Sequence, residues 1–290
     1  MTYSITHRTL YEYTAPVTVS QHVARLEPRT TDTQMRESFS LKIFPRPTLR
    51  KEREDYFGNQ LCLFSIQEVH KKLEIITHSR VNVRAPKPVD PESSLAWEEI
   101  AALFRDPVSP EVVGAYEFVF DSPQVRASFE LADYARKSFA ADTPLLIGVA
   151  DLNRRIFKDF KYDPKATTIA TPLEEVLQKR RGVCQDFAHL GIAFLRSIGL
   201  PARYVSGYLR TRPPEGKPRL VGADASHAWF SVFCPDAGWV DFDPTNNCLP
   251  GEEHITVASG RDFGDVSPVA GILIGGGQHE VKVSVDVAEV

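Results

Sequence analysis

Hydrophobic and polar residues alternate along the first part of the chain, as they do in β-strands that bury one face. The alternation is clear over residues 38–43, 60–66 and 73–83, and polar breaks such as residues 27–32 separate the runs. Successive side chains of a strand point to opposite faces of a sheet, so this period of two predicts half-buried strands. We therefore expect residues 1–85 to form an antiparallel, sandwich-like β unit.

The pattern changes after a stretch that contains prolines at positions 86, 88 and 91. From there, apolar residues recur at helical spacing over residues 97–104, 124–139 and 145–157. Residues 86–165 are therefore expected to form a linker and the helical part of a second unit.

Residues 166–290 read as helices followed by strands, which makes the whole chain an α+β protein. Pro172 at a first helical position and Glu174 in the first turn predict a helix over residues 172–179. A second helix begins near Cys184, carries a broad apolar face and ends before Gly199 and Pro201. Runs rich in β-branched and aromatic residues predict strands at 203–209, 227–233 and 238–242.

Charge and composition narrow the classes of partner. Lys and Arg total 34 and Asp and Glu total 38, which gives a formal net charge of −4. A protein without a basic field is not expected to bind nucleic acid or an anionic membrane. The first residues do not resemble a secretion signal, and the chain has no run of roughly 18 apolar residues. We therefore expect a cytoplasmic protein.

The chain has four cysteines, at positions 62, 184, 234 and 248, and no Cys-x-x-Cys pair, which disfavours a structural zinc site. Cys184 differs from the others because it lies at the predicted start of a helix. Unpaired N–H groups and the positive end of the helix dipole stabilise a thiolate there, and they can also receive an oxyanion. Cys184 is therefore a candidate nucleophile, although a small buried residue is the alternative role.

A nucleophilic thiol requires a base, and the predicted hairpin after residue 225 offers His227. If the turn is centred at residue 235, Asp243 lies directly opposite His227, where a carboxylate can bond to an imidazole N–H. A slip of one residue would place Asp243 on the other face. Asp241 shares the face of Asp243 and would oppose Trp229 in this register, so Asp243 is preferred. The two aspartates lack the oxygen-rich loop of a calcium site, and no metal dependence is expected.

The strings GVCQDFAHL, ADASHAWF and GWVDFDPTNN resemble the Cys, His and Asp boxes of the bacterial transglutaminase-like superfamily, which includes transglutaminase-like cysteine peptidases. The resemblance implies a papain-like core, in which a helix that bears the cysteine packs on an antiparallel sheet. It also implies that Cys184 is the nucleophile, His227 the base and then the acid, and Asp243 the carboxylate that orients the histidine. Tyr162 resembles an aromatic residue that assists the oxyanion in this family, and Gln185 is expected to line the site.

These assignments predict thiol-dependent acyl transfer at an amide bond of a peptide or protein substrate, without a cofactor. By analogy with bacterial members of the family we favour hydrolysis of a peptide or isopeptide bond. Transfer to a primary amine, as in a transglutaminase, is the alternative, and an assembly module that keeps the fold without activity is another. The loop at 210–226 is expected to form part of the acyl-site wall. The sequence does not specify the substrate or the oligomeric state.

Overall fold

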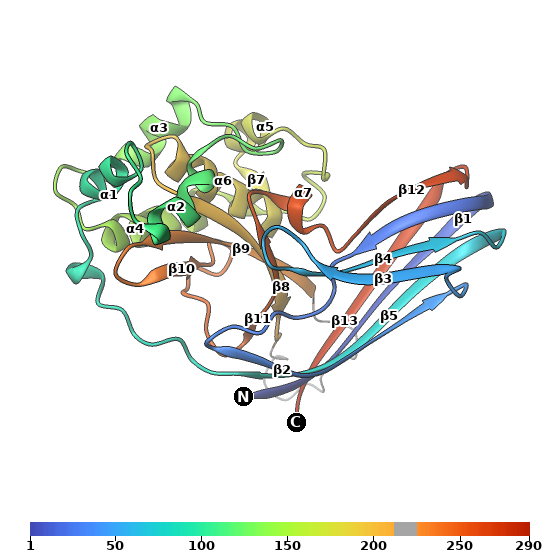
Figure 1. The fold of residues 1–290 in the computed structure, drawn as a ribbon. Helices are drawn as coiled ribbons and strands as arrows, with labels where there is room; N and C mark the ends of the chain where they lie inside the picture. Colours follow the sequence, from blue (N-terminus) through green and yellow to red (C-terminus); the bar gives the residue numbers. More distant parts are fainter. Residues whose placement is uncertain (212–224) are drawn as a thin grey trace, which may run out of the picture.

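The computed structural model describes residues 1–211 and 225–290. Most of the predicted acyl-site wall at 210–226, namely residues 212–224, therefore lies outside the described residues. Figure 1 shows an elongated sheet joined to a mixed helical and β unit. None of the described helices is long and apolar enough to cross a membrane.

The elongated part is a seven-stranded antiparallel sheet in which β1 pairs with four other strands. Its strands are β1 (Thr2–Ala24), β2 (Gln34–Phe44), β3 (Leu49–Glu54), β4 (Gln60–Ile66), β5 (His70–Val83), β12 (Val269–Gly275) and β13 (His279–Glu289). The antiparallel β unit predicted from the alternating pattern is thus confirmed.

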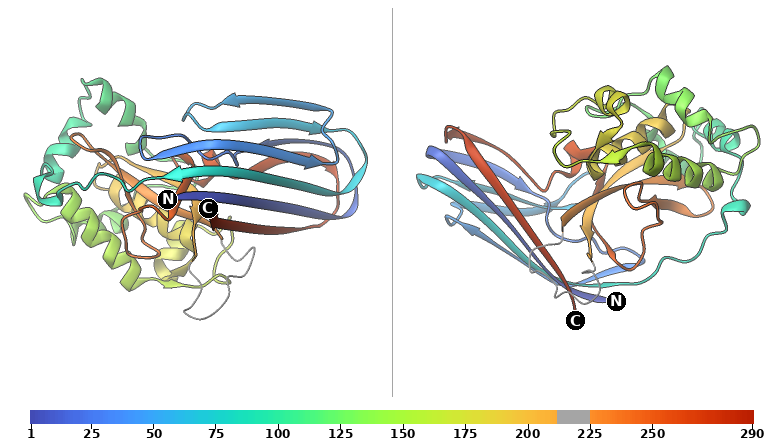
Figure 2. Two further views of the ribbon diagram at one scale, coloured as in Figure 1. Left: turned by 90° about the horizontal axis from the view of Figure 1, so that it is seen from below. Right: turned by 180° about the vertical axis from the view of Figure 1, so that it is seen from behind.

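Strand β1 belongs to two layers. Its first half, up to Tyr13, pairs with β5 and β13, whereas its second half, from Val17, pairs with β12 and β4. Figures 1 and 2 show the two halves in the two layers. Apolar side chains from β1, β2, β4 and β5, among them Ile43, Phe64 and Ile75, form one buried cluster. One strand can serve both layers because β1 has 23 residues.

The last two strands do not lie where their position in the sequence suggested. The sequence pattern places residues 269–289 with the core at 166–290, but β12 and β13 form hydrogen-bonded ladders with β1 of the N-terminal sheet. Buried Val285 and Val287 join the same cluster as Tyr3. Strand pairing between the two ends of a chain leaves no local signal, because alternation identifies a strand and not its partner.

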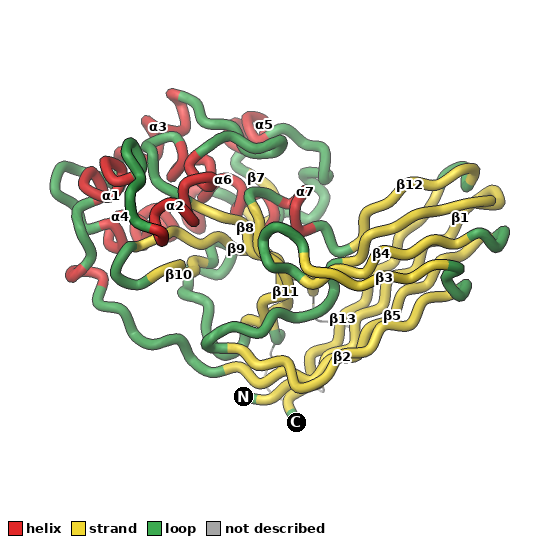
Figure 3. The backbone as a smooth tube through the Cα atoms, in the orientation of Figure 1, coloured by secondary structure: helices red, strands yellow, loops and turns green. Residues whose placement is uncertain are grey.

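The second unit contains a four-stranded antiparallel sheet in the order β10-β9-β8-β11 and a short parallel pair, β6 and β7. Its strands are β6 (Lys161–Tyr162), β7 (Arg181–Gly182), β8 (Ala202–Leu209), β9 (Ala225–Cys234), β10 (Gly238–Phe242) and β11 (His254–Gly260). Its helices are η1 (Pro91–Ser93), α1 (Trp97–Leu103), α2 (Pro110–Tyr116), η2 (Glu117–Val119), α3 (Phe129–Arg136), α4 (Leu145–Asp159), α5 (Leu173–Lys179), α6 (Cys184–Arg196) and α7 (Phe263–Val266). Figure 3 shows most helices gathered at the end of the molecule away from the N-terminal sheet.

Helix α6 is the centre of the second unit and begins at Cys184, as the sequence predicted. Its side chains Phe187 and Phe194 are fully buried, and its Gly191 lies against the ring of Phe230 on β9. The predicted helix packed on an antiparallel sheet is therefore present, and the α+β class is confirmed.

Replacing Gly191 with alanine should destabilise the fold. The added Cβ would lie 2.5 Å from two ring carbons of Phe230, and such overpacking usually lowers the free energy of unfolding by about 1–3 kcal/mol. Gly114 of α2 is a matched control, because a Cβ there meets nothing within 4 Å. Gly114→Ala should be neutral or stabilise by up to about 1 kcal/mol. Urea unfolding of both variants checks this, and equal effects would contradict it.

Candidate active site

The start of α6 is held by the side chain of Asp186. Its Oδ2 accepts the Val183 N–H at 2.8 Å and the Thr167 hydroxyl at 2.6 Å. A Cβ at Gly182 would lie 2.6 Å from the same oxygen, so only glycine leaves room for this contact. The helix therefore starts at a fixed place, and it presents the partly exposed Cys184 as its first residue.

The two other predicted residues lie next to each other. His227 on β9 and Asp243, which directly follows β10, are buried, and their Nε2 and Oδ2 atoms are 2.8 Å apart. A backbone bridge between Asp243 and Cys248 holds the turn that carries the carboxylate. The side chain of Cys184 acts on the same imidazole, because it is one of the groups that raise the pKa of His227. The structure thus brings together the three side chains that the sequence singled out.

The hairpin register behind this contact differs from the expected one. Gly238 pairs with Cys234, so the turn is centred at residue 236 and not at residue 235. Asp241 consequently lies opposite Ser231. The resulting shift of two residues keeps Asp243 on the face of His227, because side chains alternate with a period of two. Asp241 instead accepts hydrogen bonds from the Trp229 indole, at 3.0 Å, and from the Ser231 hydroxyl.

Asp243 receives five hydrogen bonds from described residues. Its Oδ1 accepts the backbone N–H groups of Thr245 and Asn246, at 2.9 and 3.2 Å. Its Oδ2 accepts from His227, from the Asn246 amide at 2.7 Å and from His254 Nε2 at 3.1 Å. Burial alone would raise the pKa of this carboxyl, but the hydrogen bonds outweigh burial and hold the pKa well below its usual range.

His254 and Asn246 were not singled out in the sequence. His254 lies at the start of β11, where it is buried, and its Nδ1 accepts the Gly251 N–H at 3.4 Å. That contact leaves the proton on Nε2, which therefore donates to Asp243. Asn246 is three residues after Asp243, inside the quoted string GWVDFDPTNN, and this proximity was the one available signal. For His254 the signal was absent, because its contact depends on pairing between β8 and β11.

The environment of His227 favours its charged form. Burial lowers the pKa of the imidazole, but the hydrogen bond and charge of Asp243, together with the neighbouring Cys184 side chain, raise it to about 9. The imidazole of His227 is therefore held as a cation between a carboxylate and a sulfur at neutral pH.

The other two residues that the sequence singled out, Tyr162 and Gln185, both lie near Cys184. Tyr162 on β6 pairs with Gly182, and its side chain is 51% exposed. The pKa of its phenol is raised by burial and by the nearby Cys184. Gln185 is the second residue of α6 and partly exposed. Their roles toward an oxyanion or a substrate stay predictions.

His227, Asp243 and His254 could also be considered as ligands of a metal ion, since their donor atoms lie within 4.8 Å of one another. The contacts of Asp243 with the two imidazoles, 2.8 and 3.1 Å, have hydrogen-bond lengths. His254 Nε2 carries a proton, as its contact with Gly251 requires, and a protonated nitrogen cannot bind a metal. We therefore assign the cluster to hydrogen bonding.

Comparisons with known proteins agree with this architecture. Residues 3–82 match the bacterial transglutaminase-like N-terminal region, and residues 132–244 match the transglutaminase-like superfamily. An uncharacterized protein of Mycobacterium tuberculosis is 41% identical over 290 residues, which cover 98% of this chain and 92% of that protein. The chain therefore belongs to the bacterial transglutaminase-like superfamily.

Two further relatives are informative. A protein-glutamine gamma-glutamyltransferase of Pseudomonas aeruginosa is 33% identical over 137 residues, 44% of this chain and 19% of that protein. A crystal structure of a candidate cysteine protease from Cytophaga hutchinsonii superposes with a TM-score of 0.76 and 21% identity, over 99% of this chain and 90% of that chain. The second similarity shows that the whole fold, including the N-terminal sheet, is shared.

The pair of His227 and Asp243 should make stability depend on pH. A pKa raised from 6.5 to about 9 means that the folded protein binds this proton more tightly than the unfolded chain. The stabilisation is complete below pH 6.5 and is lost as the pH rises through 9. The difference in unfolding free energy between wild type and His227→Gln should shrink by up to about 3 kcal/mol over this range.

Urea unfolding of both proteins at several pH values from 6 to 9.5 measures this difference. His7→Gln is the control, because burial lowers the pKa of His7 to about 4. His7 is neutral in both states above pH 7.5, so its contribution should stay constant there and change only at lower pH. A difference for His227 that does not vary between pH 6.5 and 9 would contradict the assignment.

Proposed function

We propose that this protein catalyses thiol-dependent acyl transfer at an amide bond, with Cys184 as nucleophile, His227 as base and acid, and Asp243 as the orienting carboxylate. The observation that carries the proposal is the row of Cys184, His227 and Asp243, in which a 2.8 Å hydrogen bond joins His227 to Asp243 and the sulfur that acts on His227 lies at a helix start. In such a row the carboxylate fixes the imidazole tautomer and supports its positive charge. The opposite ring nitrogen then faces the thiol.

The proposed reaction has two stages. The Cys184 thiolate attacks the amide carbonyl carbon, and the C–N bond breaks as the His227 imidazolium gives its proton to the leaving amine. The product of this stage is a thioester and a neutral imidazole. His227 then takes a proton from the second nucleophile, which attacks the thioester and releases Cys184. Backbone N–H groups in the first turn of α6, including that of Gln185, would receive the oxyanion, with Tyr162 as a further donor.

Water as the second nucleophile would make the protein a cysteine peptidase or amidase, and we favour this outcome with a peptide or isopeptide substrate. Its support is the shared fold with the candidate cysteine protease of Cytophaga hutchinsonii. A primary amine would make it a transglutaminase, and the similarity to the Pseudomonas aeruginosa gamma-glutamyltransferase favours that alternative. Neither reaction requires a cofactor. A cytoplasmic location remains part of the proposal.

Limiting iodoacetamide at pH 6 should label Cys184 first. An unperturbed thiol with a pKa of about 8.5 is almost fully protonated at pH 6, whereas a thiolate paired with an imidazolium reacts. Cys62 and Cys234 are buried and serve as internal controls. Mass spectrometry of digested protein should show that His227→Ala slows labelling of Cys184 on the order of tenfold or more.

The same preparation then separates the possible reactions. Release of product from a peptide library without added amine indicates hydrolysis, and incorporation of a fluorescent primary amine into a glutamine-containing protein indicates transfer. Cys184→Ala should abolish either signal while the fold is retained. Slow and equal labelling of all four cysteines, with neither product, would favour a module without activity.

His254 should act as a positioning residue for Asp243. His254→Phe removes one of five donors to the carboxylate, so the imidazole of His227 is less firmly oriented. We expect labelling of Cys184 at pH 6 to slow about tenfold, and the pH profile of labelling to change. His254→Gln, which keeps an N–H donor, should recover part of the rate. His22→Phe is the control, since His22 stacks on Phe64 within the N-terminal sheet. An unchanged profile would show that His254 serves packing alone.

A further inference from the structure

A cleft lies on the molecule away from Cys184. Its volume is about 340 Å³, which is within the range of small-molecule sites. We call it the Arg203 cleft. Arg203 is four residues before Gly207 on β8, and Gly207 pairs with His227. The rise per residue in a strand places Arg203 roughly 13 Å from that pair, so the cleft is separate from the proposed active site.

The cleft combines aromatic walls with one cation. The residues used below are Tyr56 and Phe57 from the β3–β4 loop, Glu117 and Phe118 from η2, Arg203 from β8 and Trp239 from β10. The guanidinium carbon of Arg203 lies 4.3 Å from the centre of the Trp239 ring. Tyr56 is 80% exposed at the rim.

Arg203 has no hydrogen-bond acceptor among the described residues. Its Nε is buried without a partner, and no described residue accepts from the rest of its guanidinium. The oppositely charged group that acts on it is Asp241, but the hydrogen bonds of that carboxylate come from Trp229 and Ser231. Burial lowers the pKa of Arg203 to about 10, so the side chain is still a cation at neutral pH. A buried guanidinium nitrogen without an acceptor is costly, and structures usually satisfy it.

The neighbouring arginines differ in this respect. Arg29 donates to the carbonyl of Phe57 at 2.8 Å and to Asn59 Oδ1 at 2.6 Å. Arg261 donates from Nε and Nη2 to the two oxygens of Asp265, at 2.9 and 3.0 Å. Among these three arginines, Arg203 is the one whose fork is free to take an anion.

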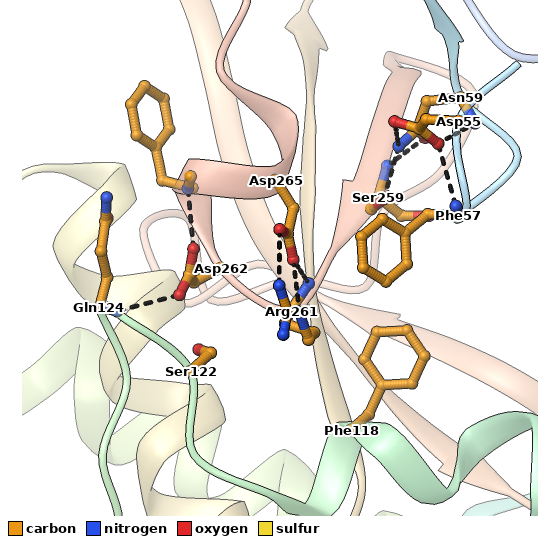
Figure 4. A network of polar contacts seen from close by, with 12 residues as sticks. Asp55, Phe57, Asn59, Phe118, Ser122, Gln124, Ser259, Arg261, Asp262 and Asp265 are labelled. Atoms are coloured by element: carbon orange, nitrogen blue, oxygen red, sulfur yellow. Dashed lines mark hydrogen bonds and ion pairs between the residues drawn. The ribbon is translucent and has the colours of Figure 1, made fainter.

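The walls of the cleft are held in place by polar contacts, which Figure 4 shows. Asp55 accepts the N–H groups of Phe57 and Asn59, at 3.0 and 2.9 Å. Asn59 in turn bonds to both backbone groups of Ser259 on β11, at 2.8 and 2.9 Å. The ring of Phe57 consequently faces that of Phe118, with centres 6.0 Å apart. The aromatic surfaces are therefore arranged before any ligand arrives, which lowers the entropic cost of binding.

We propose that the Arg203 cleft binds a monocarboxylate that carries an aromatic group. The planar fork of arginine matches a carboxylate with two parallel hydrogen bonds. The rings of Phe118 and Trp239, 5.0 Å apart, provide a surface for the aromatic group. Glu117 also lines the cleft, and its carboxylate disfavours a ligand with a second negative charge. This proposal does not depend on the activity proposed for Cys184.

Titration of the whole protein with phenylacetate tests the proposal. Tryptophan fluorescence should change and saturate in the millimolar range or tighter, the order of affinity available to ten non-hydrogen atoms. Phenylacetamide has the same shape without the charge, and acetate has the charge without the ring, so both should bind roughly tenfold more weakly or worse. Trp239→Phe should remove most of the signal, because Trp239 is the tryptophan at the cleft.

Arg203→Gln should weaken phenylacetate binding roughly ten- to hundredfold, whereas Arg136→Gln, at an exposed arginine of α3, should leave it unchanged. If Arg203→Gln does not fold, Glu117→Gln decides the matter, because removing this carboxylate should tighten binding several-fold. Equal affinity for phenylacetate and phenylacetamide, or no saturable binding by the wild type, would overturn the proposal.

Discussion

The buried carboxylate of Asp243 is the constraint on which the candidate site depends. A desolvated charge is tolerated only when it is paired and hydrogen-bonded, and Asp243 meets this requirement with donors from three separate segments. His227 comes from β9, His254 from β11, and Thr245 and Asn246 from the turn after β10. All of these donors reach Asp243 only when the sheet has this register and the turn after β10 has this conformation. The same contacts that make the carboxylate tolerable also orient His227, so stability and the proposed chemistry rely on one set of hydrogen bonds.

The sulfur reaches this carboxylate-imidazole pair through a different set of contacts. Helix α6 starts where Asp186 satisfies the Val183 N–H, and the absence of a side chain at Gly182 allows it. The remainder of α6 is buried against the sheet, so Cys184 cannot shift along the helix axis without moving Gly191 from the ring of Phe230. Rigid packing behind a partly exposed residue is the arrangement that positions a reactive group. The N-terminal sheet adds support, because His7 of β1 bonds to Tyr208 of β8 at 2.9 Å.

The sequence predicted what periodicity and capping can encode. The start of α6 at Cys184, the antiparallel N-terminal strands and the shared face of His227 and Asp243 all follow from local patterns. The predicted hairpin register was wrong by two residues because the turn centre was assumed. Asp243 still lies on the predicted face, because a shift of two residues does not change the face of a strand to which a side chain points. The partner of β13 and the role of His254 were not predictable, since both depend on contacts between strands far apart in the chain. The candidate site depends on such long-range contacts more than the fold class does, so less of it could be predicted from the sequence.

One face of the sheet carries two cations, His227, which has a hydrogen-bond acceptor, and Arg203, which has none among the described residues. The two aspartates near the end of β10 explain this difference. Asp241 and Asp243 are two residues apart, so both point to the same side as His227, Trp229 and Ser231. Asp243 gives its oxygens to the histidines, and this holds His227 as a cation. The oxygens of Asp241 accept hydrogen bonds from Trp229 and Ser231. Arg203 is therefore attracted by the charge of Asp241 but has no hydrogen-bond acceptor among the described residues. Trp229 contacts both systems, since its ring centre is 6.0 Å from that of His227 while its N–H bonds to Asp241.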